Sequence, residues 1–110
     1  MEGASIPEPL PKQQGIPVTP LVLRWLDDYG KRADIDVKEV KALIQARDAF
    51  GRKKYSQPLL TADGRDGIED ARQELGDAIQ YLVKARYNGK DTTVLHQAAL
   101  FVLALTMKEA

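Results

Sequence analysis

Three acidic residues in the second half of the chain have a spacing that suits the chemistry of a bound metal ion. Asp70, Glu74 and Asp77 stand at positions i, i+4 and i+7 of a helical segment, so their carboxylates share one stripe. Carboxylate oxygens bind hard cations such as Mg²⁺, and substrate phosphates and waters complete the octahedron. A solvated acidic helix face has the same pattern, so these three residues alone leave both interpretations open.

A fourth acid, Asp48, falls inside the apolar arc of an earlier helical segment. On a helical wheel it lies about 40° from Ile44. A carboxylate on a buried face is costly unless a cation compensates it, so Asp48 requires Arg47, Arg52 or a metal ion as its partner. A metal site and a plain ion pair with an arginine are both open at this point.

Positive charge is concentrated around the segment that connects these two acidic helices. An arginine binds phosphate oxygens as a bidentate fork and a lysine binds them as a point charge, so the cluster is a candidate phosphate-binding group. An ordinary solvated basic turn is the commoner outcome for such residues. The four candidates are Arg52, Lys53, Lys54 and Arg65.

The composition of the chain excludes several functional classes. Its 110 residues include no cysteine and one histidine, which excludes disulfides, thiol nucleophiles and Cys-ligated metal and disfavours a histidine-based triad. Sixteen basic residues balance sixteen acidic ones, which argues against nucleic acid and acidic membranes as partners. The longest apolar run, residues 98–105, is too short to span a bilayer, and the N-terminus lacks the features of a signal peptide. We therefore expect no membrane association and a cytoplasmic location.

Two helices are expected in the first half of the chain. Thr19-Pro20 predicts an N-cap followed by proline at the first helical position, and the apolar face that follows closes near Gly30. Asp36 is a candidate cap for the second helix. That helix should end near Tyr55, because Pro58 discourages its continuation.

Two more helices are expected after a loop over residues 56–66. Asp66 can cap the third helix, and Asn88-Gly89 is a strong C-terminal stop. Asp91 can cap a fourth helix over about residues 92–108.

The predicted fold is all-α, an up-down bundle of about four helices, because no segment alternates apolar and polar residues over the length of a strand. Residues 1–19 are rich in proline and are expected to form an extended or disordered arm, followed by a single domain over 20–110. The fourth helix is apolar on every side and must be buried on every side. A domain of this size cannot easily enclose it alone, so oligomerisation should complete the fold, with a symmetric dimer as the default.

Longer strings in the middle of the chain resemble a known family. Residues 46–59, 64–66 and 70–77, which include the strings KKY, PL, GRD and ELGD, resemble small MazG-like proteins of phages and other mobile elements. These belong with the all-α nucleoside triphosphate pyrophosphohydrolases, and the similarity covers roughly residues 40–87. The resemblance implies a homodimer or homotetramer that uses Mg²⁺, with Mn²⁺ as the second choice. Such an enzyme cleaves a (d)NTP between the α and β phosphates to give (d)NMP and pyrophosphate.

That family is known for an ExxE pair on one helix and an ExxD pair on the next. Glu74 and Asp77 match the second pair, whereas Gln45 and Asp48 stand in place of the first, and Asp70 is a candidate for the missing charge. The resemblance implies that Asp48, Glu74 and Asp77 are catalytic and that they bind the metal together with Asp70.

The resemblance also assigns roles to the basic and aromatic residues. The phosphates would be bound by Arg52, Lys53, Lys54 and Arg65. The rest of the nucleotide would be contacted by Gln45, Tyr55 and Tyr81, although tyrosines at helical spacing are more often core residues. The altered first acidic pair keeps an alternative open, a catalytically degenerate helical oligomer that acts as a nucleotide-binding or protein-interaction module.

Overall fold

A computed structural model describes residues 13–108, and these are helical apart from loops and one isolated antiparallel bridge. Residues 13–108 contain four helices: α1 (Val18–Ala33), α2 (Lys38–Tyr55), α3 (Gly67–Tyr87) and α4 (Thr93–Thr106). This confirms the all-α class and the number of helices predicted from the sequence.

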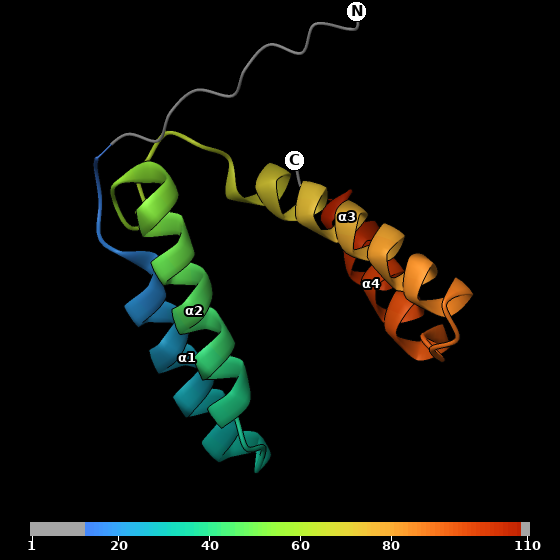
Figure 1. The fold of residues 1–110 in the computed structure, drawn as a ribbon. Helices are drawn as coiled ribbons and strands as arrows, with labels where there is room; N and C mark the ends of the chain where they lie inside the picture. Colours follow the sequence, from blue (N-terminus) through green and yellow to red (C-terminus); the bar gives the residue numbers. More distant parts are fainter. Residues whose placement is uncertain (1–12, 109–110) are drawn as a thin grey trace, which may run out of the picture. The chain divides into compact units, whose positions relative to one another are not determined.

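The chain divides into two compact units, Met1–Gly64 and Arg65–Ala110. The first unit contains the hairpin of α1 and α2, and the second contains the hairpin of α3 and α4 (Figure 1). The single domain expected over residues 20–110 stays a prediction. None of the helices in the described residues is long and apolar enough to cross a membrane.

The start of α1 differs from the prediction. Thr19 is not the cap: the helix begins at Val18, two residues before the predicted first helical position, Pro20, and it follows Pro17 without a side-chain cap. Pro20 is accommodated because the N–H groups of the first turn have no partner within the helix, so proline loses no hydrogen bond there.

The end of α1 also differs, because Gly30 lies within the helix. The helix continues to Ala33, and Asp34 ends it in the left-handed conformation with φ of 53°. A Cβ added at Gly30 would lie 2.9 Å from the carbonyl oxygen of Ile35 and 3.1 Å from Val37. The glycine therefore lets the returning chain pack directly on the helix. In the sequence, a glycine in this tertiary role cannot be distinguished from one that ends a helix.

The end of α2 agrees with the prediction, whereas its N-cap position is occupied by Val37 and not by Asp36. Asp36 stands two residues before its first residue and accepts a hydrogen bond from the Lys38 N–H at 3.0 Å. The helix ends at Tyr55, and Ser56 follows in the left-handed conformation with φ of 59°. Lys41 of α2 reaches across to α1, where its Nζ lies 2.8 Å from Oδ1 of Asp27.

Of the predicted N-terminal arm, residues 1–12 lie outside the described residues. Residues 14–18 pair with residues 59–62 in the loop after α2, through three backbone hydrogen bonds of 2.8–3.2 Å. The Thr61 hydroxyl also accepts a bond from the Ile16 N–H at 3.0 Å. This part of the arm is therefore tied to the first unit.

The caps of α3 and α4 follow the local signals in the sequence. Oδ1 of Asp66 accepts hydrogen bonds from two N–H groups of the first turn of α3, at 3.0 and 3.3 Å. Asn88 ends α3 and Gly89 follows with φ of 95°, as predicted. Asp91 accepts from the Thr93 N–H at 3.2 Å, and Thr92 occupies the N-cap position of α4 itself.

Little of the described chain is buried. Leu26 in α1, 8% exposed, is the one large apolar side chain that is buried among residues 13–108. In α4 most of the large apolar side chains are exposed instead, including Val94, Leu100 and Phe101. The two hairpins therefore pack their helices in pairs without enclosing a hydrophobic core of the usual size.

Candidate functional site

The acidic stripe predicted on α3 divides into one paired carboxylate and two open ones. Arg65 forms a bidentate ion pair with Asp70, with Nε 3.0 Å from Oδ2 and Nη2 2.7 Å from Oδ1. Glu74 and Asp77 are exposed, and within residues 13–108 no hydrogen bond or ion pair engages either carboxylate. These two side chains are thus available to bind a cation from solvent.

The pairing of Arg65 with Asp70 joins two residues for which different ligands were predicted. Asp70 was a candidate for the metal and Arg65 for a phosphate. A planar guanidinium matches a carboxylate and a phosphate equally well, because both present two oxygens to its fork. In this structure the carboxylate of Asp70 is the partner that the Arg65 fork holds.

Asp48 is mostly buried and has an arginine as partner, as the helical wheel required. Its side chain is 17% exposed, and its Oδ2 lies 3.0 Å from Nε of Arg52 one turn along α2. The ion-pair interpretation of Asp48 is therefore the one seen in this structure. Arg47, the other candidate partner, instead places its guanidinium 4.6 Å from the centre of the Phe50 ring.

The end of α2 forms an exposed basic segment. Lys53 and Lys54 are exposed, and Nζ of Lys54 lies 5.3 Å from the centre of the Tyr55 ring. The positive charges also stand at the C-terminus of the helix, where the backbone dipole favours them. Their position is suited to contact with an anion and is equally that of a normal helix end.

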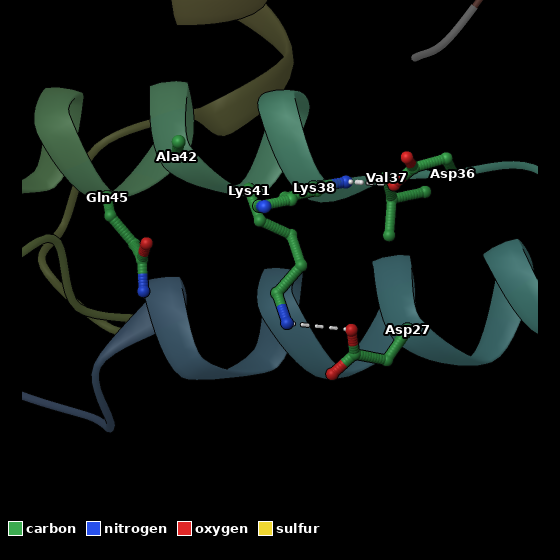
Figure 2. Close-up of a pocket in the computed structure, with 7 residues that line it drawn as sticks. All are labelled: Asp27, Asp36, Val37, Lys38, Lys41, Ala42 and Gln45. Carbon is green, nitrogen blue, oxygen red and sulfur yellow. Dashed lines mark hydrogen bonds and ion pairs between the residues drawn. The ribbon is translucent and has the colours of Figure 1, made fainter.

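Gln45 lies at an open depression along the hairpin of α1 and α2. Figure 2 shows Lys41 and Gln45 reaching from α2 toward α1, with Lys41 bonded to Asp27. The other residues that line the depression are Asp36, Val37, Lys38 and Ala42. Asp27 and Lys41 were missed in the sequence, because only the pairing of α1 with α2 reveals that they meet.

A cluster of polar contacts in the second unit was also missed. The Thr92 hydroxyl is buried, donates to the Leu82 carbonyl at 3.0 Å and lies 3.2 Å from Nδ1 of His96. At the other end of the hairpin, the Arg72 guanidinium donates to the Thr106 carbonyl. Both contacts hold α4 against α3 and involve none of the predicted site residues. Tyr81, predicted to contact a nucleotide, is exposed on α3.

The donor atoms of the acidic stripe suit Mg²⁺, although the described residues supply only part of a ligand set. Within residues 13–108 no three His, Asp or Glu side chains lie together as a metal-binding group. Glu74 and Asp77 provide two open carboxylates of the type that Mg²⁺ prefers, and Mg²⁺ commonly takes its remaining ligands from waters and phosphates. Asp48 belongs to the first unit and the α3 acids to the second, and each unit is described by itself.

Comparison of the chain with family models, with curated proteins and with solved structures gave no match in any of the three.

Proposed function

We propose that this chain is a Mg²⁺-dependent nucleoside triphosphate pyrophosphohydrolase that converts a (d)NTP to (d)NMP and pyrophosphate. The observation that carries the proposal is the pair of open carboxylates on α3, Glu74 and Asp77, within a string that resembles MazG-like proteins. The wider proposal is a cytoplasmic homodimer or homotetramer, of the type found in phages and mobile elements, that clears or rebalances nucleotides.

In this proposal Glu74 and Asp77 are the primary ligands of the ion. When bound, Mg²⁺ neutralises charge on the triphosphate and lowers the pKa of the attacking water. The exposed position of both carboxylates lets them accept a hydrated ion without first breaking a contact in the described residues.

The two arginine pairs give the remaining residues a defined role. Arg52 and Arg65 neutralise Asp48 and Asp70 in the free protein. A triphosphate would offer either guanidinium group a more highly charged partner, and the carboxylate released in that unit would then be a further candidate ligand of the cation. Lys53 and Lys54 add positive charge for the phosphates, and Tyr55, Tyr81 and Gln45 are the candidates for contact with the base and sugar.

The test is an assay of pyrophosphate release from each (d)NTP in the presence of Mg²⁺. Glu74→Gln and Asp77→Asn should abolish release while helicity, measured by circular dichroism, is unchanged. Glu69→Gln is the matched control, because Glu69 is an exposed acid of the same helix outside the stripe. Release that survives in both stripe variants would remove the proposed metal ligands from the mechanism.

The same two arginine pairs favour a second candidate function, a degenerate site that binds without catalysis. If the acids remain satisfied by arginine, a nucleotide can bind the basic residues without correct placement of the metal. Stabilisation of the protein by Mg²⁺ and nucleotide without turnover would identify this function. Neither turnover nor a change in thermal stability with any nucleotide would contradict both candidates.

A further inference from the structure

The turn between α3 and α4 contains a pair of residues that the proposed function does not use. Asn88, the one asparagine of the chain, stands directly before Gly89. Residues 87–91 are all exposed, and a Cβ added at Gly89 would meet nothing within 4 Å. Water therefore reaches both the side-chain amide of Asn88 and the peptide nitrogen that follows it.

An asparagine that precedes glycine can react with its own backbone. The Gly89 nitrogen, once a base has taken its proton, attacks Cγ of Asn88, ammonia leaves, and a five-membered succinimide ring forms. Glycine favours this attack because it has no Cβ to hinder the nitrogen. Water then opens the ring, at Cγ to give aspartate or at the main-chain carbonyl carbon to give isoaspartate. The net change converts an amide and one water into a carboxyl group and ammonia.

The fold holds this pair in a hydrogen-bonded helix cap. The Gly89 N–H donates to the Arg86 carbonyl at 3.0 Å. The Lys90 N–H donates to the Ala85 carbonyl, also at 3.0 Å. With Gly89 in the left-handed conformation at φ of 95°, these two bonds form a Schellman motif. The attacking nitrogen is therefore already engaged as a donor in the closed cap.

The backbone angle at Asn88 also keeps the reacting atoms apart. A five-membered ring needs Cβ of Asn88 and the Gly89 nitrogen on the same side of the Cα–C bond, and at a ψ of 15° they are not. Rotation about that bond breaks the hydrogen bonds that Gly89 and Lys90 make in the cap. Helix ends open locally at a low cost in free energy, so the ring closes from the opened cap.

We propose that Asn88 is a site of spontaneous deamidation whose rate is set by opening of the cap at the end of α3. Either product weakens this cap. Aspartate adds a negative charge at the helix C-terminus, where the backbone dipole disfavours it. Isoaspartate carries the main chain through its Cβ and Cγ, so the hydrogen bonds of Gly89 and Lys90 lose their register. The proposal concerns the hairpin of α3 and α4 alone and does not depend on nucleotide hydrolysis.

Mass spectrometry of the full chain after prolonged incubation at mildly alkaline pH tests the proposal. Trypsin cleaves after Arg86 and Lys90 and releases residues 87–90 as a separate peptide. This peptide should gain the mass difference between NH2 and OH and resolve into aspartate and isoaspartate forms on reversed-phase chromatography. Residues 73–84 form the internal control peptide, because Gln73 and Gln80 are exposed amides of the same helix that cannot form a five-membered ring. The control peptide should stay unmodified.

Three comparisons separate the effect of the cap from that of the residue pair. Unfolding in guanidinium chloride should accelerate deamidation roughly 10-fold or more, because the cap no longer has to open. Asn88→Gln keeps an amide at the same position and should lose both products, with helicity checked by circular dichroism. Asn88→Asp contains the first product and should melt at a lower temperature than the wild type.

Several results would overturn the proposal. An unmodified wild-type peptide, or equal modification of the control peptide, would remove Asn88 as the reactive site. Equal rates in the native and unfolded chain would show that the cap does not set the rate. An unchanged melting temperature of Asn88→Asp would show that the added charge does not weaken the cap. The measurements on the wild type do not require any variant to fold.

Discussion

Arg65 holds both oxygens of Asp70, and Arg52 holds one oxygen of Asp48 at 3.0 Å. The second pair joins two side chains that differ in their exposure to water. In the second pair the acid is 17% exposed and the arginine 50% exposed, so the carboxylate depends on its partner more than the guanidinium does. The cost of breaking the pair should therefore depend on which residue is removed.

Arg52→Gln should destabilise the protein by roughly 1–2 kcal/mol, because it leaves the mostly buried Asp48 without its cation. Asp48→Asn should cost only about 0.5 kcal/mol, the value of an i,i+4 pair whose arginine is solvated. Urea unfolding measures both. Lys53→Gln is the control and should change stability by less than about 0.5 kcal/mol, since Lys53 is exposed. Equal losses for Arg52→Gln and Asp48→Asn would mean that Asp48 is as well solvated as its partner.

At the scale of helices, Gly30 is where the structure constrains α1 most tightly. Gly30→Ala should destabilise the protein by about 1–3 kcal/mol, because the new Cβ would lie 2.9 Å from a backbone carbonyl oxygen of the returning chain. Gly51→Ala in α2 is the matched control, since a Cβ there meets nothing within 4 Å. It should instead stabilise the helix by about 0.5–1 kcal/mol. Thermal unfolding of both variants checks the prediction, which fails if both changes have the same sign.

The start of α4 should show a weak dependence on pH. The Thr93 N–H and hydroxyl beside Asp91 hold the pKa of that carboxyl below its ordinary value. A lowered pKa means that the charged form stabilises the fold above the ordinary aspartate pKa of about 3.9, and that this contribution disappears as the pH falls through the lowered value. Asp91→Ala should therefore cost more stability at pH 7 than at pH 3. Urea unfolding at the two pH values measures the difference, and an equal cost at both would show that the charge of Asp91 has no effect.

The same scale shows how much of the fold the sequence could predict. Asp66, Asn88-Gly89 and the end of α2 at Tyr55 were correct, because a cap or stop is decided by residues within one turn. The predictions of the start of α1 from Thr19 and of its end from Gly30 were wrong, because both bounds depend on the chain that returns over the helix.

In the candidate site too, contacts within one helix could be predicted from the sequence and contacts that depend on tertiary structure could not. The need of Asp48 for a cation could be predicted from the helical wheel, and Arg52 satisfies it from within the same helix. The ion pair of Arg65 with Asp70 could not be predicted from the sequence, because it depends on the path of the loop before α3. Pairs across a hairpin, such as Asp27 with Lys41, require knowledge of which helices are neighbours.

For the whole molecule, the small amount of buried apolar surface links stability to association. Leu26 is the one buried large apolar side chain in residues 13–108, and most large apolar side chains of α4 are exposed, so the proposed homodimer would draw part of its free energy of folding from contacts between copies. A dimer that unfolds to separate chains has a melting temperature that rises with protein concentration. For chains of this length, a roughly 100-fold increase should raise Tm by about 5–10 °C. Scanning calorimetry over that range measures the shift, and a wild-type Tm that does not change with concentration would show that each chain is stable alone.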